Sequence, residues 1–275
     1  MLPVNFHQTF IPERRYIASL LQYAALGDQG TLQEIAEDTG IPMGESSGKL
    51  AATIDYATGM GLICIESAAD RSVKRPILTA FGHVVYAEDK FLGEQMAQWL
   101  AHMNLCSSLI GATAWHEVFA KGRRLLGISF TRDQLEDYLV RIYGPTKTRT
   151  RTGPLLLTYQ EDEALGRSGV LTVDEDTVTR HKAPIMDEYA IPYSAYVLQL
   201  LETHFPGQNQ ITLTDFADST LWFDICLWNE MDVEDVMRVI ESKGLVSVDR
   251  QMQPWIIEKR ADADRVWSLI YSEIV

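Results

Sequence analysis

Apolar residues near the N-terminus recur with a helical period in three successive stretches. The first covers residues 13–25, where every third or fourth residue is apolar, as expected of a helix with one buried face. The second begins after Thr31, because Glu34 stands three residues later and completes a capping box with it. The third begins at Ser46 or Ser47, whose hydroxyls can cap it, and ends where two glycines interrupt the pattern.

Two short apolar runs of strand character follow the third helix. Residues 62–65 and 73–78 flank a polar turn, which predicts a β-hairpin. Three helices and a hairpin in this order form a winged helix-turn-helix, whose third helix enters the major groove of DNA while the hairpin contacts the backbone. Because such modules also serve in dimerisation and protein docking, the pattern leaves DNA contact and protein contact both open.

The middle of the chain is predicted to be helical from residue 79 to about Tyr143. Thr131, three residues before Gln134, predicts the start of one helix in this region. His102 and His116 lie among tryptophans on the apolar stripes. A histidine in such a place is more often a hydrogen-bonded core residue than a ligand, so we expect both to be buried.

The C-terminal half repeats the N-terminal order. A helix that opens near residue 211, a helix capped by Asp232 and a hairpin at residues 246–257 predict a second winged-helix-like module, followed by a last helix at about residues 262–271. The helix equivalent to the third N-terminal helix carries three acidic residues. This second copy is therefore expected to avoid DNA and to bind protein.

Residues 144–154, GPTKTRTRTGP, form the most positive segment of the chain. Lys147, Arg149 and Arg151 alternate with threonines, no acid is present, and Gly-Pro stands at both ends. We expect this segment to lie outside the core as an inter-domain linker. As a cationic strip it can also hold a phosphate backbone, and the two interpretations are compatible.

Taken together, the pattern predicts a mainly α fold with small β wings, of the α+β class. The predicted segments are an N-terminal winged helix-turn-helix at residues 1–90, a helical middle region at 91–145, a basic Thr/Arg linker at 146–154 and an acidic C-terminal domain at 155–275 that contains the second module.

Charge is distributed unevenly along the 275 residues. The net charge is −14, yet residues 1–150 hold 14 Lys and Arg against 16 Asp and Glu, whereas residues 151–275 hold 10 against 22. Phosphate binding rests on cations, so DNA contact is expected of the first half, with its positive side chains converging on one face. The candidate DNA-binding residues are Ser47, Lys49, Lys74, Arg75, Arg123, Arg124, Lys147, Arg149 and Arg151.

Several classes of function are disfavoured by the sequence. No apolar run approaches the ~20 residues of a membrane span, and the absence of a secretion-type start favours a cytoplasmic protein. Cys64, Cys106 and Cys226 lack metal-type spacing and are expected to be buried thiols. No phosphate-binding Gly-rich loop, nucleophile elbow or zinc-protease motif occurs, and the acidic runs 161–163 and 174–176 are typical of solvated faces. The residues therefore assign neither a catalytic group nor a metal site.

A set of short motifs in a fixed order resembles the SspB-like family, proteins found beside bacterial DNA sulfur-modification genes. The motifs are His7-Gln8-Thr9-Phe10 followed by Arg14; Gly61-Leu62-Ile63; Leu78-Thr79-Ala80-Phe81-Gly82; Asp89; Trp99 with His102; Trp115; and Phe130-Thr131 before Leu135. The family usually has Glu at the position of Gln8 with its Arg one place earlier, and Gly-Lys-Asn in place of Gly48-Lys49-Leu50.

The resemblance implies a role in replacing a phosphate oxygen of DNA by sulfur in a phage-defence (Ssp) system, together with an ATPase and sulfur-transfer subunits. It further implies a DNA-interacting component that nicks one strand to assist sulfur incorporation, with Mg²⁺ or Mn²⁺ as the cofactor of any nicking. No catalytic residue is carried over. The alternative is a non-catalytic winged-helix transcription regulator or an assembly adaptor.

Overall fold

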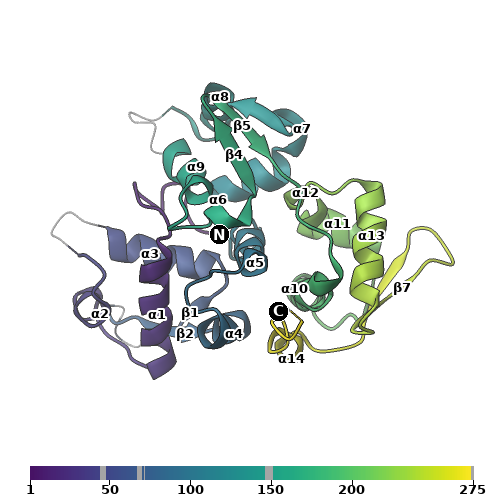
Figure 1. Cartoon of the computed structure of the whole chain (residues 1–275), viewed down its shortest axis with the longest axis horizontal. Helices are drawn as coiled ribbons and strands as arrows, with labels where there is room; N and C mark the ends of the chain where they lie inside the picture. The colour runs from purple at the N-terminus through teal and green to yellow at the C-terminus, as the bar shows by residue number, and fades with distance from the viewer. Residues whose placement is uncertain (44–47, 67–69, 71, 146–150, 274–275) are drawn as a thin grey trace. The chain divides into compact units, whose positions relative to one another are not determined.

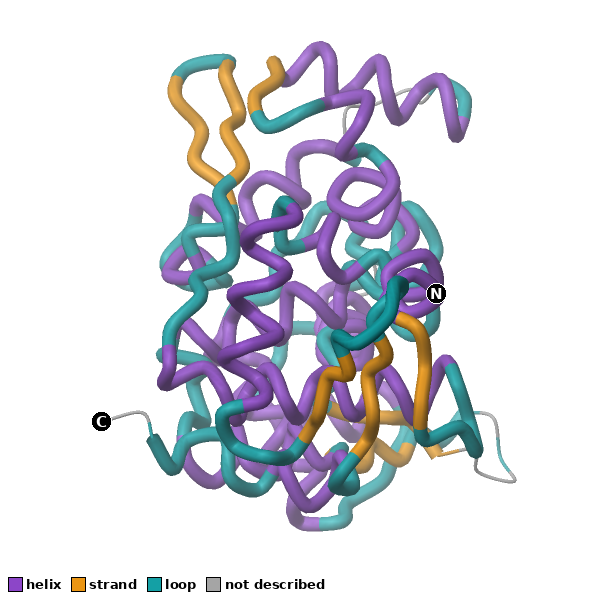
Figure 2. The backbone as a smooth tube through the Cα atoms, turned by 90° about the vertical axis from the view of Figure 1, so that its right-hand side faces the viewer, coloured by secondary structure: helices purple, strands orange, loops and turns teal. Residues whose placement is uncertain are grey.

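The computed structural model describes the chain except residues 44–47, 67–69, 71, 146–150 and 274–275 (Figure 1). Its contacts form two compact units, unit 1 at Met1–His181 and unit 2 at Lys182–Val275. The fold is α+β, and the described residues form helices and three small antiparallel sheets. Figure 2 shows the strands as short orange segments of the backbone among purple helices. This division does not coincide with the four predicted segments, because residues 155–181 pack within unit 1.

The N-terminal part of unit 1 has the predicted order of three helices and a hairpin. Thr31 and Glu34 form the expected capping box. Gly48 is the N-cap residue of the third helix, and the predicted caps Ser46 and Ser47 lie outside the described residues. The elements are α1 (Arg14–Leu26), α2 (Leu32–Thr39), α3 (Lys49–Gly59), β1 (Ile63–Glu66) and β2 (Arg75–Leu78).

The middle of unit 1 is mainly helical, with the predicted helix start at Thr131, but it also contains a strand that the sequence patterns did not predict. Gly127, with φ of 72°, ends a short helix, and the following residues run extended as a strand before the capping box of Thr131 and Gln134 starts the next helix. The elements are α4 (Ala80–Glu88), α5 (Gln95–Leu105), α6 (Thr113–Trp115), a π-helix η1 (His116–Lys121), α7 (Arg123–Leu126), β3 (Ser129–Thr131) and α8 (Arg132–Tyr143).

Unit 1 ends with a helix and a hairpin that the sequence patterns did not predict. β5 lies between β3 and β4, so a strand from the middle of the chain is paired with one about fifty residues later. Thr152 and Pro154 are buried in the first turn of α9, so the expectation that the whole basic segment lies outside the core is wrong for its last residues. The elements are α9 (Thr152–Gln160), η2 (Gly166–Ser168), β4 (Leu171–Asp174) and β5 (Thr177–Arg180).

Unit 2 is built around α10, whose residues are buried along most of its length. Trp222 and Trp228, with ring centroids 4.9 Å apart, anchor an aromatic core beside it. Asn229 rather than Asp232 caps the long acidic helix, because Asp232 occupies the third position of the capping box. The elements are η3 (Asp187–Tyr189), α10 (Ala190–His204), β6 (Gln210–Thr212), α11 (Leu213–Thr220), α12 (Trp222–Ile225), α13 (Glu230–Glu241), β7 (Val246–Asp249), β8 (Ile256–Lys259) and α14 (Ala263–Trp267).

Two further predictions concern the burial of the cysteines and the lack of a membrane span. All three cysteines are free, Cys106 and Cys226 are buried, and Cys64 is exposed on β1, contrary to expectation, because it lies on the outward face of a two-stranded ribbon. Within the described part of the chain, no helix has both the length and the apolarity that crossing a bilayer would require.

Candidate nucleic-acid interface

Lys49, at the start of α3, is held inside a compact arrangement of unit 1. Its Nζ donates to a carboxylate oxygen of Glu13 and lies 4.7 Å from the centroid of the Tyr16 ring. The Lys49 side chain is 18% exposed and that of Glu13 is 11% exposed. Burial raises the pKa of Glu13, but hydrogen bonds from Lys49 and Arg15 outweigh this effect and keep the pKa below its usual value. The Lys49 charge is therefore compensated at neutral pH.

The N-terminal loop that carries the His-Gln-Thr-Phe motif covers the first turn of α3. The side-chain amide of Gln8 lies against Gly48, so close that a Cβ at that position would require the Gln8 side chain to move. Tyr56, inside α3, donates its hydroxyl proton to the carbonyl of Phe10 at 3.1 Å. The loop and α3 are thus assembled as one unit.

Arg14, the last residue of the same motif, connects the start of α1 by hydrogen bonds to the turn at residues 161–163. Its backbone N–H donates to the Glu163 carbonyl at 2.7 Å, and its Nε donates to the Asp162 carbonyl at 3.0 Å. Its guanidinium also reaches the Phe91 carbonyl at 3.2 Å. These bonds hold the backbone of the run 161–163, whose acidic side chains are exposed, as predicted.

Lys74 and Arg75 lie at the start of strand β2. Arg75 Nη1 is 2.7 Å from Glu66 Oε2 on β1, but both side chains are about half exposed, so water screens the pair and the guanidinium stays accessible. Lys74 is half-buried and its backbone exchanges two hydrogen bonds with Gly30. Burial raises the pKa of Asp55, and the charge of Lys74 opposes that rise.

Arg123 and Arg124 belong to α7, the short helix that follows the π-helix. Arg124 is exposed, and the neighbouring Leu125 and Ile128 are 78% and 60% exposed. Figure 1 places α7 at one end of unit 1 and the β1–β2 hairpin at the other. The predicted convergence of these cations into one track is therefore absent: they form two separate groups.

The basic strip is only partly described. Its cations Lys147 and Arg149 lie outside the described residues, and so does the candidate Ser47 from the N-terminal module. Arg151 is 7% exposed, donates from Nη1 to the Gly144 carbonyl at 2.8 Å and lies over the Tyr143 ring. The guanidinium of Arg151 thus holds the end of α8 to the start of α9 and is not presented to solvent.

A buried polar cluster occupies the centre of unit 1. The Tyr159 hydroxyl accepts a hydrogen bond from Trp115 Nε1 at 2.9 Å and lies 2.6 Å from Nδ1 of His102. Burial raises the pKa of Tyr159 and lowers that of His102, so both groups are neutral at physiological pH. His116 contacts the Cys106 carbonyl at 2.8 Å. Both histidines are core residues, as predicted.

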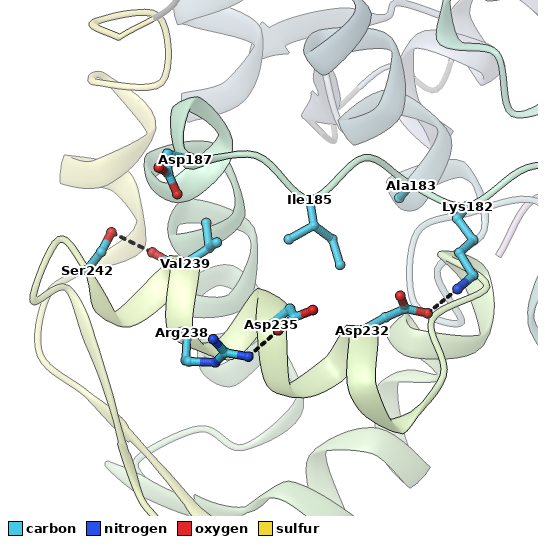
Figure 3. A pocket seen from close by; sticks show the side chains of 9 residues that line it. All are labelled: Lys182, Ala183, Ile185, Asp187, Asp232, Asp235, Arg238, Val239 and Ser242. Atoms are coloured by element: carbon cyan, nitrogen blue, oxygen red, sulfur yellow. Dashed lines mark hydrogen bonds and ion pairs between the residues drawn. The ribbon is translucent and has the colours of Figure 1, made fainter.

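An open groove of about 560 Å³ follows one side of α13 in unit 2 (Figure 3). Lys182 is paired with Asp232 at 2.5 Å, and Arg238 is paired with Asp235. The two cations of the groove are thus matched by acids of α13. Across the described residues, no group of three or more His, Cys, Asp or Glu side chains can hold a metal ion, so we assign no metal ligand.

Most partners of the predicted residues were not visible in the sequence. Glu13 pairs with Lys49 across 36 positions, and Arg14 contacts Asp162 across 148. Neither pair has a local spacing that could reveal it. The ion pair of Arg75 with Glu66, by contrast, follows from the predicted hairpin, since the two residues are directly opposite in its register.

The fold is similar to that of two solved structures. One is described as a magnesium ion-bound SspB crystal structure and aligns with a TM-score of 0.70 at 15% identity; the other is an SspB crystal structure with a TM-score of 0.69 at 14% identity. Each comparison covers 98% of this chain and 87% of the other chain. No protein-family model and no curated protein sequence matches the chain. The likeness therefore lies in the fold, which is SspB-like along nearly the whole chain.

Proposed function

We propose that the chain is a DNA-interacting component of an SspB-like phosphorothioation and phage-defence system. The observation that carries the proposal is the similarity of fold over 98% of the chain. It agrees with the order of motifs from His7 to Leu135, which resembles the same family. The proposal includes a winged helix-turn-helix role for α1–α3 with the β1–β2 hairpin, an ATPase and sulfur-transfer subunits as partners, and nicking of one DNA strand.

Two described sites are proposed for contact with DNA. Lys74 and Arg75 on the β1–β2 hairpin form one, and Arg123 and Arg124 on α7 form the other. Ser47, Lys147 and Arg149 stay in the proposal on their sequence alone. Lys49 is proposed to contact DNA only when its ammonium group is no longer paired with Glu13. Mg²⁺ or Mn²⁺ would serve any nicking step by neutralising charge at the scissile phosphate.

Nicking is tested with supercoiled plasmid. The purified full chain is expected to convert supercoiled plasmid to open circle in Mg²⁺ or Mn²⁺ and to stop doing so in excess chelator, because the proposed nicking uses the cation to neutralise charge at the phosphate. Gel electrophoresis over time gives the rate. Protein that binds the plasmid yet never yields open circle would contradict nicking and favour the non-catalytic alternative.

Replacing the cations proposed to bind phosphate is expected to weaken DNA binding and to flatten its salt dependence. Each phosphate that is no longer neutralised reduces the steepness of log K against log salt by about 0.9. We predict this for Arg123→Ala with Arg124→Ala and, independently, for Lys147→Ala with Arg149→Ala. Fluorescence anisotropy with duplex DNA at several salt concentrations measures the slope.

The control removes the same charge from unit 2. Arg238→Ala with Arg260→Ala deletes two cations that are paired with acids, so the slope should stay at the wild-type value. A slope that is unchanged in both test variants would remove α7 and the basic strip from the proposed interface.

Glu13→Gln is expected to strengthen DNA binding. The neutral amide no longer compensates the Lys49 ammonium, which lies in the first turn of the helix proposed to enter the groove. We expect a few-fold higher affinity and a salt slope steeper by about 0.9. Glu37→Gln, an equal change of charge on exposed α2, is the control. Equal effects of the two variants would show that only net charge matters.

A second candidate function is an assembly adaptor without catalytic activity. The observation that favours it is the charge of unit 2, where 7 Lys and Arg face 16 Asp and Glu, a balance of −9. Such a surface repels nucleic acid and attracts basic proteins. Plasmid binding without nicking, combined with binding of a basic partner, would select this candidate.

A further inference from the structure

A second groove of unit 2, of about 630 Å³, lies between α11, the first turns of α13 and the turn that joins β7 to β8. Phe223 and Trp228, 9% and 2% exposed, belong to the aromatic core and also line this groove. Trp255 lines it from the hairpin side, where Arg250 lies 5.0 Å from its ring. The groove thus combines a rigid aromatic lining with access from solvent.

Its charged lining is of one sign only. Glu230 and Glu234, both exposed on α13, are the ionisable residues among the described residues that line it. The groove of Figure 3 differs, because its lining also holds two cations, Lys182 and Arg238, which pair with Asp232 and Asp235. The acidic groove therefore suits a positively charged occupant and disfavours a phosphate backbone.

Two elements that contribute to the groove also carry exposed methionines. Met231 on α13 is 76% exposed and Met252 on the β7–β8 turn is 78% exposed. Methionine side chains are flexible and adapt to varied apolar surfaces, so they are frequent at binding surfaces that accept peptides. These two methionines are the chain neighbours of Glu230 and Gln253, which line the groove.

We infer that this groove binds a segment of a partner protein that carries a large apolar side chain flanked by Lys or Arg. The apolar side chain enters against Phe223 and Trp228, and the flanking cations pair with Glu230 and Glu234. Central apolar anchors with surrounding charge complementarity are the usual source of affinity and selectivity in such contacts. The inference rests on the proposed function in one respect: partner subunits of the proposed system are the proteins expected to carry such a segment.

The test uses two synthetic dye-labelled peptides and the full chain. One twelve-residue peptide has a central Trp flanked by Lys and Arg, and its match has Ser in place of Trp. Anisotropy should show binding of the Trp peptide and at least tenfold weaker binding of the Ser peptide. The variant Glu230→Lys with Glu234→Lys should weaken binding of the Trp peptide at least tenfold. Ala217→Arg, which fills the groove from α11, should weaken it to the same extent.

The matched control reverses an equal amount of charge outside the groove. Glu188→Lys with Asp264→Lys changes two exposed acids of unit 2 that do not line it, and it should leave Trp-peptide binding within twofold of wild type. Circular dichroism confirms that each variant is folded, and Ala217→Arg keeps the test decisive if the charge reversal unfolds unit 2.

Three results would overturn the inference: no binding of the Trp peptide, equal binding of the two peptides, or equal losses in the groove and control variants. Plasmid nicking by the same variants is measured in parallel. If the wild-type chain does not nick plasmid but still binds the Trp peptide through the groove, the proposed nicking is contradicted and the inference about the groove stands.

Discussion

Tyr159→Phe is expected to lower the free energy of unfolding by about 2–4 kcal/mol. The hydroxyl is fully enclosed, accepts a hydrogen bond from Trp115 Nε1 and can give its proton to His102 Nδ1. Phenylalanine fills the same space, so little of the destabilisation comes from packing. It comes from two buried polar groups left without this partner, each costing about 1–3 kcal/mol.

Urea denaturation followed by circular dichroism measures the change. Tyr86→Phe removes a hydroxyl from a half-buried tyrosine of the same unit and should shift the unfolding midpoint by little. If Tyr159→Phe were as stable as wild type, the polar cluster would not be a continuous set of hydrogen bonds. The variant should leave DNA affinity unchanged, because none of these side chains reaches solvent.

Features encoded within a few residues could be predicted from the sequence. The capping boxes at Thr31 and Thr131 follow from a three-residue spacing, and the β1–β2 hairpin follows from two apolar runs around a polar turn. The buried state of His102 and His116 follows from their apolar neighbours. In each case the interaction that decides the structure is local.

Features that depend on distant residues were missed. Strand β3 is too short to show a period of its own, and it is a strand because β5 pairs with it. Arg151 looks like part of a solvated strip, yet it is buried because α8 and α9 enclose it. The cap of α13 was placed three residues late, because Asp232 and Asn229 share one capping box.

The same limit applies to the candidate interface. The sequence supplies Lys49 and Arg75 as cations, and the predicted hairpin places Glu66 opposite Arg75, but no local spacing reveals that Glu13 accompanies Lys49. The two pairs differ in consequence. Glu13 and Lys49 are mostly buried, so their pairing persists in salt, whereas Arg75 and Glu66 are exposed and weakly bound. The β1–β2 hairpin is therefore the more available of the two for contact with phosphate.

Acidification from pH 7 to pH 5 is expected to destabilise the protein through His7. This histidine of the N-terminal motif is fully buried, with its ring edge-on to Phe6 and near Trp115. Its Nδ1 lies 3.0 Å from the Gln8 carbonyl, which can only accept, so Nδ1 carries the proton. Its Nε2 is buried without a hydrogen-bond partner among the described residues. Protonation at Nε2 would place an unsolvated charge there.

The direction follows from the two protonation states. Burial lowers the pKa of His7 from 6.5 to about 4, although the hydrogen bond to Gln8 opposes the shift. Between these values the unfolded chain binds the proton and the folded chain does not, so the free energy of unfolding falls as the pH falls. The full decrease is about 3 kcal/mol, and about 2 kcal/mol of it is reached by pH 5. Burial lowers the pKa of His102 and His116 too, which adds to the same trend.

His7→Asn isolates this contribution, because asparagine can keep the hydrogen bond to the Gln8 carbonyl but does not titrate. We expect the stability of the variant to change less between pH 7 and pH 5 than that of wild type, by about 2 kcal/mol. His83→Asn, at an exposed position, is the control and should follow the wild-type curve. Glu13 does not interfere, since a carboxyl with a lowered pKa loses its stabilising effect only as the pH falls below its usual 4.5. A His7→Asn curve parallel to wild type would mean that His7 is solvated, and the loop that covers α3 would then be open in solution.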